Sequence, residues 1–163
     1  PSPFRQEPLV STLEAYFQGK KDLFGGLAME RWEKDWESYL VLHIDFSLTK
    51  YMELTDLTGQ LNLFLHRWEK IYGKDEAEKT ASERLQGIIL RASEQIGKQV
   101  VVLIDEYDAP LLDSNSDTAL QQQLRNEMRK FFSPPQEVGA VSSLSLHHRH
   151  QQVQPTEHLQ RTE

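Results

Sequence analysis

Two neighbouring carboxylates follow an uninterrupted aliphatic run in the 163-residue chain: Val100 to Ile104 lead directly into Asp105 and Glu106. Five consecutive β-favouring aliphatic residues predict a strand that is covered on both faces, as strands of parallel sheets are. Open α/β sheets bind their ligands at the carboxyl edge of such strands. The spacing therefore predicts a Walker B arrangement, in which both acids lie at a ligand-binding edge. A capped strand and turn without a ligand is the alternative that the same pattern allows.

The two acids would divide the chemistry of a nucleoside triphosphate site between them. Asp105 is predicted to hold magnesium through its waters, because this hard cation prefers oxygen ligands and keeps part of its hydration shell. Glu106 is predicted to orient and polarise the water that attacks the terminal phosphate, which is mostly positioning and electrostatic work. The candidate assignments are Asp105 for the metal, Glu106 for catalysis, and both for the cofactor magnesium-ATP.

Apolar residues at intervals of three and four predict the helices that would position this strand. They predict four helices: residues 9–18, residues 54–72, a helix from Thr80 or Ser82 to residue 96, and a helix from Ser116 or Asp117 to residue 132. The apolar run at 40–46 predicts a second buried strand. Trp32 and Trp36, four residues apart, are expected to share one face of a short helix or turn. Helices that alternate with buried strands indicate an α/β fold with a mostly parallel sheet.

The two ends of the chain lack such patterns. Three prolines within residues 1–8 predict an irregular segment. Residues 134–163 are rich in Ser, His and Gln without any period, which predicts a disordered low-complexity tail. One domain over 9–133 is expected between them. Because the chain begins with Pro1 rather than Met, it is interpreted as a fragment.

Composition narrows the classes of function. A formal net charge of −7 opposes a broad nucleic-acid-binding face, since phosphate contacts come largely from clustered Lys and Arg. The chain has no cysteine, which excludes disulfides, cysteine-ligated zinc and thiol nucleophiles and is in keeping with a cytoplasmic protein. No run approaches the length of apolar sequence that a membrane span requires. Membrane and nucleic-acid partners are therefore not expected, and the protein partner is unknown.

The residues after Glu106 add a family pattern. The stretch from Val101 to Asp108 with Pro110-Leu111-Leu112 closely resembles the AAA-ATPase-like family, bacterial P-loop ATPase-like proteins that often carry a PD-(D/E)XK nuclease-like domain. Ser11 to Phe17, with Lys20 to Leu27 behind it, looks like the helix after the family's Walker A motif and the segment that follows. The resemblance covers about Leu9 to Phe132. It implies a three-layer P-loop NTPase-like domain, here expected to be incomplete at both ends.

The resemblance fails where the phosphate loop should stand. The family has Phe-Gly-Lys-Ser there, whereas this chain reads Phe4-Arg5-Gln6-Glu7-Pro8. A phosphate loop needs glycine for backbone curvature, lysine for the β and γ phosphates, and a hydroxyl for magnesium. Glu7 adds negative charge beside the expected phosphates, and Pro8 removes a backbone donor. The copy is therefore predicted to bind ATP poorly and to be inactive, and a shifted reading frame at both ends is the hypothesis for its origin.

Two other functions remain open. The chain could be a nucleotide-independent protein-interaction module in which Asp105 and Glu106 bind a partner's basic group. It could also be a pseudogene-like fragment without function, because losing the strands beside Val100 to Ile104 would leave sheet edges unpaired.

Several other side chains can be interpreted as either structural or functional. His43 is expected to be a hydrogen-bonded strand histidine, and Asp45 either a cap or part of the nucleotide edge. Asp108 and Asp113 are interpreted as turn formers. The three tryptophans, Trp32, Trp36 and Trp68, are expected to pack rather than stack on bases, because acidic residues flank them. His147, His148 and His150 are assigned to the disordered tail rather than to a metal site.

Overall fold

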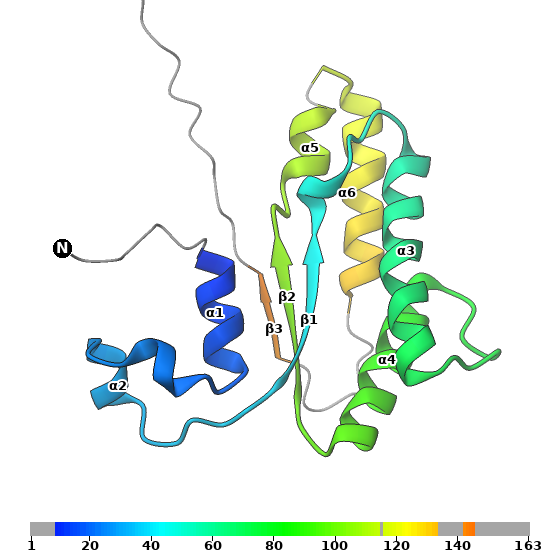
Figure 1. Cartoon of the computed structure of the whole chain (residues 1–163). Helices are drawn as coiled ribbons and strands as arrows, with labels where there is room; N and C mark the ends of the chain where they lie inside the picture. The colour runs from blue at the N-terminus through cyan, green and yellow to red at the C-terminus, as the bar shows by residue number, and fades with distance from the viewer. Residues whose placement is uncertain (1–8, 115, 134–141, 146–163) are drawn as a thin grey trace, which may run out of the picture.

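The computed structural model describes residues 9–114, 116–133 and 142–145 of the chain (Figure 1). The elements in chain order are α1 (Leu9–Phe17), η1 (Lys21–Phe24), α2 (Ala28–Trp32), β1 (Leu40–Asp45), η2 (Phe46–Leu48), α3 (Leu54–Tyr72), α4 (Ala81–Ile96), β2 (Val100–Asp105), α5 (Ala109–Asp113), α6 (Thr118–Phe132) and β3 (Ser142–Ser145). The four helices and two strands expected from apolar spacing are all present, and their limits agree closely.

The sheet is parallel and has the order β1-β2-β3. The strands β1 and β2 pair from Leu40 beside Val100 to Asp45 beside Asp105. The strand β2 lies between the other two, and all five residues from Val100 to Ile104 are buried. The prediction of a central strand covered on both faces is thus confirmed, and the class of the fold is α/β.

Helices cover this sheet from two sides (Figure 1). Every second residue of the strands points into the main core, which α3, α4 and α6 complete. The strand residues of this core are Leu42, Ile44, Val100, Val102 and Ile104. Helix α1 contacts β1 and β2 from the other side, where Val101 and Leu103 are buried as well. Alternating side chains of β2 therefore meet apolar partners on each face, which explains the continuous aliphatic run.

Local signals set the ends of the helices that carry the core. Thr80 accepts a hydrogen bond from the backbone of Glu83, whose side chain bonds back to the cap, so a capping box opens α4. Helix α4 ends at Gly97, which has a left-handed backbone with φ 69°. Asp117 accepts a hydrogen bond from Leu120 N and opens α6. Of the two residues proposed for this start, Asp117 is confirmed as the cap.

Three expectations need correction. Helix α5 lies where only a turn was expected. Trp32 ends α2, whereas Trp36 lies in an irregular segment, so these two tryptophans do not share a helix. Strand β3 falls within the segment predicted to be disordered, at Ser142–Ser145. The rest of that segment and residues 1–8 lie outside the described residues, and the domain limits 9–133 stay a prediction. Within the described ranges, no helix combines the length and apolarity that crossing a bilayer requires.

Candidate functional site

The carboxyl ends of β1 and β2 bring two aspartates to one edge of the sheet. Asp45 and Asp105 are partners in the parallel register, and neighbouring strands lie ~4.8 Å apart. Asp45 Oδ1 accepts a hydrogen bond from Ser47 N at 2.8 Å, and Asp105 Oδ1 accepts one from Glu106 N at 2.9 Å. Asp45 thus caps η2, as one interpretation expected, and it lies beside Asp105, while its part in a nucleotide edge stays a prediction.

The chain turns sharply directly after Asp105. Glu106 has φ 51°, and within the described ranges it is the one residue other than glycine with positive φ. This left-handed conformation is unfavourable for a side chain with a Cβ, and such residues concentrate at functional sites. Glu106 O accepts a hydrogen bond from Ala109 N at 2.9 Å, which closes the turn. The backbone at the second predicted acid is therefore held in a strained geometry.

Two residues after Asp105, Tyr107 fixes this turn to the core. Its ring lies 6.5 Å from the ring of Phe46 and 5.9 Å from that of Phe132. These contacts join the segment after β2 to the end of β1 and to α6, so Tyr107 has a packing role. This role was not predicted from the sequence, because Phe46 and Phe132 are distant from Tyr107 along the chain.

Asp108 opens α5 and differs from an ordinary turn former. Its backbone oxygen accepts hydrogen bonds from Leu111 N and Leu112 N, both at 2.9 Å. Its side-chain Oδ1 is buried and has no hydrogen-bond partner. A buried carboxylate oxygen without a donor carries an uncompensated desolvation cost. A water or a cation beside this oxygen would satisfy it.

Asp113, also interpreted as a turn former, instead ties α5 to the loop after β1. Its carboxylate accepts a hydrogen bond from Tyr51 N and binds Lys50 Nζ, both at 3.2 Å. The Tyr51 hydroxyl donates to Phe46 O at 2.9 Å. Burial raises the pKa of Tyr51 well above its usual range, and the charges of Asp45 and Asp113 raise it further. The contacts of Asp113 with Lys50 and Tyr51 join residues about sixty positions apart, so no local sequence pattern predicts them.

The residues of this edge fit a hydrated magnesium ion. Asp45 and Asp105 supply hard oxygen donors at paired strand ends, and magnesium is usually held by one or two carboxylates with waters and phosphate oxygens. Among the described residues no three His, Asp or Glu side chains converge closely enough to hold a metal by themselves. Waters and phosphate oxygens would have to complete the coordination. Phe4 to Pro8, which were expected to stand in place of the phosphate loop, lie outside the described residues.

The remaining candidates fall away from this edge. His43 was expected to be hydrogen-bonded, yet its buried Nε2 has no partner. Trp68 stacks on Phe64 with ring centres 6.0 Å apart, as expected of a packing residue. Trp32 was expected to pack, and this is wrong, because it is 81% exposed. His147, His148 and His150 lie outside the described residues.

Comparison with known proteins identifies the family. Residues 2–144 match the family model AAA-ATPase_like, described as "Predicted AAA-ATPase". The chain therefore belongs to the AAA-ATPase-like family, as its resemblance suggested. The match begins before Leu9 and continues past Phe132, so it is longer at both ends than the stretch recognised from motifs.

A curated relative adds similarity but no function. The chain is 31% identical over 135 residues to a protein of Azotobacter chroococcum mcd 1 described as "Uncharacterized protein in vnfD 5'region". The aligned part covers 82% of this chain and 26% of that protein, so the chain spans about a quarter of its relative's length. No solved structure matches the chain significantly.

Proposed function

We propose that this chain is a P-loop NTPase-like domain that retains the metal-binding part of an ATPase site and has an impaired phosphate-binding part. The observation that carries the proposal is the carboxyl edge of the parallel sheet, where Asp45 and Asp105 end neighbouring strands and the strained Glu106 follows. Membership of the AAA-ATPase-like family supports the same reading, because magnesium and nucleotide are what its relatives are expected to bind.

Each residue has a defined task in this proposal. Asp105 would hold a magnesium ion through its waters, and its Oδ1 already accepts a hydrogen bond from Glu106 N, which fixes its direction. Asp45 adds negative charge at the adjacent strand end. Glu106, turned out of the strand by its positive φ, would orient a water. When bound, magnesium would neutralise charge on the phosphate oxygens.

The phosphate part of the site is where this chain departs from its family. Arg5, Gln6 and Glu7 replace the glycine, lysine and serine of the family loop, and Pro8 follows them. Without these groups the β and γ phosphates lose their main donors. ATP is therefore expected to bind with a dissociation constant above about 1 mM, which corresponds to a binding free energy weaker than about −4 kcal/mol.

Restoring the missing loop tests this division directly. Isothermal titration calorimetry would measure ATP binding, with and without magnesium, for the unchanged chain and for the triple variant R5G/Q6K/E7S. The triple variant is expected to gain at least tenfold in magnesium-dependent affinity, a change of about 1.4 kcal/mol. Adding D105N to it should remove the magnesium dependence. The control D22N changes an exposed carboxylate of η1 and should leave the gain intact.

Two results would overturn the proposal. Micromolar ATP binding by the unchanged chain would show that its phosphate part is not impaired. A triple variant that binds ATP no better, while keeping a cooperative thermal transition, would show that Asp105 and Glu106 do not belong to a nucleotide site. ATP hydrolysis measured on the same samples should stay at background for the unchanged chain and depend on Glu106 in the restored one.

A further inference from the structure

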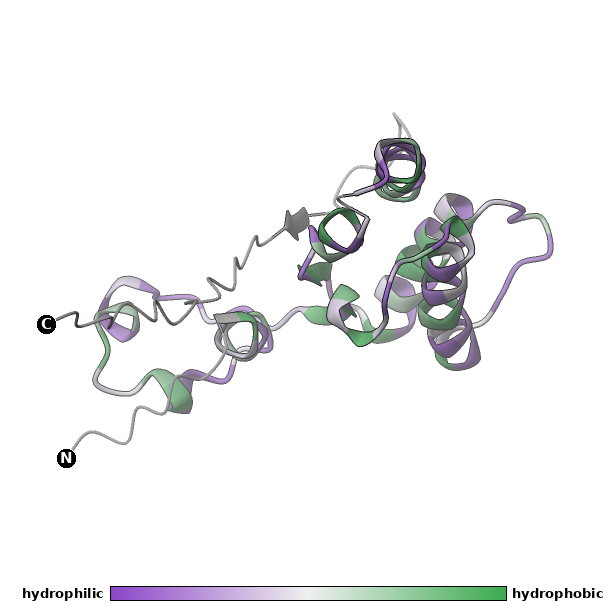
Figure 2. Ribbon diagram, turned by 90° about the horizontal axis from the view of Figure 1, so that it is seen from above, coloured by the Kyte–Doolittle hydropathy of each residue, from purple (hydrophilic) through white to green (hydrophobic). Residues whose placement is uncertain are grey.

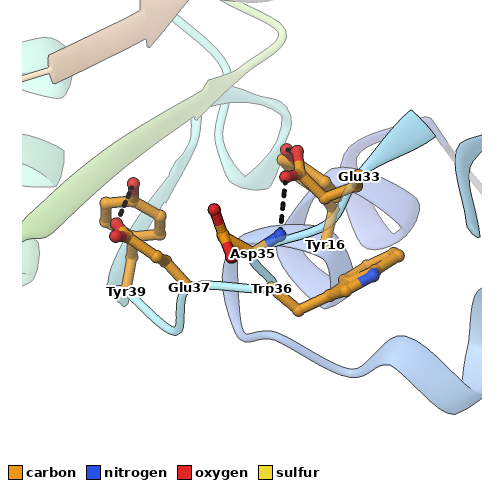
Figure 3. A pocket seen from close by; sticks show the side chains of 6 residues that line it. All are labelled: Tyr16, Glu33, Asp35, Trp36, Glu37 and Tyr39. Atoms are coloured by element: carbon orange, nitrogen blue, oxygen red, sulfur yellow. Dashed lines mark hydrogen bonds between the residues drawn. The ribbon is translucent and has the colours of Figure 1, made fainter.

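A pocket of about 250 Å³ lies far from the carboxylates of the proposed ATPase site, at the amino end of β1. Figure 3 shows its lining, which we call the acidic aromatic pocket: Tyr16, Glu33, Asp35, Trp36, Glu37 and Tyr39. Three members are acids, three are aromatic, and none is basic. Asp35 lies between the Tyr16–Glu33 side and the Glu37–Tyr39 side (Figure 3).

The pocket is built by contacts that fix its walls. The Tyr16 hydroxyl donates to Glu33 Oε2 at 2.6 Å, and the Tyr39 hydroxyl donates to Glu37 Oε2 at 2.9 Å. The ring of Trp36 lies 5.6 Å from that of Tyr16 and 5.1 Å from that of Phe24, which is buried. These contacts hold the irregular segment 33–39 against α1, so the aromatic surfaces are ordered before any partner arrives.

The charges of the pocket have no counter-ion within the described part of the chain. None of the ion pairs among the described residues involves Glu33, Asp35 or Glu37. Within the same residues, the Asp35 carboxylate accepts no hydrogen bond. The hydrogen bond to Glu33 raises the pKa of Tyr16, and that to Glu37 raises the pKa of Tyr39. Both tyrosines thus stay neutral donors in a negative field, and a cation is the missing charge.

An exposed apolar surface adjoins this pocket along the chain. Leu23 of η1 is 67% exposed, and Met29 and Trp32 of α2 are 39% and 81% exposed. Helix α2 has no buried residue, and η1 and α2 extend away from the sheet (Figure 2). Exposed tryptophan and methionine are typical of protein interfaces and unusual on free surfaces. This observation is independent of the acids and points to a protein partner.

We propose that the acidic aromatic pocket and the exposed side chains of η1 and α2 form a docking surface for a protein segment that carries an arginine between apolar residues. A planar guanidinium can stack on an aromatic ring while it binds a carboxylate with two parallel hydrogen bonds. The apolar neighbours of that arginine cover Met29 and Trp32. Nucleic acids and anionic lipids are repelled by the three carboxylates. This surface is independent of the proposed nucleotide site.

A capped peptide tests the chemistry. The probe is acetyl-Ala-Leu-Arg-Leu-Ala-amide, and its control replaces arginine by citrulline, which has nearly the same shape but no charge. Two-dimensional nuclear magnetic resonance would follow the indole N–H signals of the tryptophans. The signals of Trp32 and Trp36 are expected to shift with the arginine peptide, while that of Trp68, which stacks on Phe64 of α3, stays unchanged. Equal binding of the citrulline peptide, or shifts confined to Trp68, would overturn the proposal.

Variants on the two parts of the surface separate its contributions. D35N and E37Q change exposed carboxylates, so the fold should survive, and together they are expected to weaken the peptide about fivefold. W32A should weaken it as well, by removing apolar contact. The control E94Q changes an exposed carboxylate of α4, and it should bind the peptide normally. Affinity unchanged in D35N/E37Q overturns the proposal, and so does a dimer that these substitutions dissociate, because a second copy would then be the occupant.

Discussion

Asp45 and Asp105 occupy adjacent positions at the carboxyl ends of two paired parallel strands. Two like charges at one edge of a sheet repel each other and destabilise the fold unless a cation lies between or beside them. A cation bound beside this pair would therefore stabilise the domain, and this effect can be measured without any nucleotide.

Magnesium is expected to raise the melting temperature of the unchanged chain. At a concentration ten times the dissociation constant, binding to the folded state alone adds about 1.4 kcal/mol to the free energy of unfolding, a shift of roughly 5 °C. D105N should melt higher than the unchanged chain in the absence of magnesium, because one charge is gone, and should respond little to the ion. A magnesium response of the same size in D105N would show that the ion binds elsewhere.

The left-handed backbone of Glu106 predicts an effect on stability that can be distinguished from the loss of its carboxylate. E106A and E106G both remove the carboxylate, but only glycine accepts φ 51° without strain. E106G is expected to exceed E106A in free energy of unfolding by about 1 kcal/mol. Urea denaturation of the two variants measures this difference. If E106A proves the more stable of the two, residue 106 does not have its left-handed conformation in solution.

The ion pair between α3 and α4 predicts how acid destabilises the domain. Arg84 Nε and Nη2 bind the two carboxylate oxygens of the buried Glu69, at 2.7 and 2.9 Å. The hydrogen bond to Arg84 holds the pKa of Glu69 below its ordinary value of 4.5. Since the unfolded chain then binds the proton more readily, this stabilisation is complete above about pH 4.5 and is lost as the pH falls through the lowered value.

E69Q should therefore lose stability at neutral pH, by about 3 kcal/mol, because Arg84 keeps its charge without a carboxylate. Its stability should also fall less steeply than that of the unchanged chain between about pH 5 and about pH 3. Urea denaturation across this range is the measurement. The control E94Q changes an exposed carboxylate of α4 and should keep the steep fall. Parallel pH profiles for E69Q and the unchanged chain would contradict the prediction.

Gly87 in the middle of α4 leaves room for a neighbouring ion pair. A Cβ at this position would clash with Glu78 Oε1, and Glu78 forms two hydrogen bonds with Arg91. Alanine favours a helix interior over glycine by about 1 kcal/mol, but here it displaces Glu78. G87A is expected to add about 1 kcal/mol to the stability of E78A and clearly less to that of the unchanged chain. An equal gain in both backgrounds would mean that Glu78 does not cover Gly87.

The elements that the sequence predicted are those with dense local signals. Helices α3 and α4 have long apolar stripes and caps, and β2 has five aliphatic residues in a row. Helix α5 was missed because five residues with Pro110 near its start carry no repeat that separates a helix from a turn. Strand β3 was missed because Ser142–Ser145 is too short and too polar for a strand pattern.

The site was predictable only in part, for a similar reason. Asp105 and Glu106 follow a recognisable strand, so their place at the sheet edge was accessible from sequence. The tie from Asp113 to Tyr51 and the packing of Tyr107 between Phe46 and Phe132 connect residues far apart in the chain. The exposure of Trp32 depends on α2 standing away from the core, which residue type alone does not indicate.

Helix α2, which buries no side chain, also sets how stability is distributed along the molecule. Opening such a segment exposes little new apolar surface, so its amide hydrogens should exchange with solvent early, whereas those of β2 should exchange only when the whole domain unfolds. A partner that covers Trp32 would slow exchange in α2 and leave β2 unaffected. Under the two proposals, the two ends of the sheet would therefore be occupied independently: a partner would order a loosely held helix at one end, and a cation would balance charge on a rigid strand at the other.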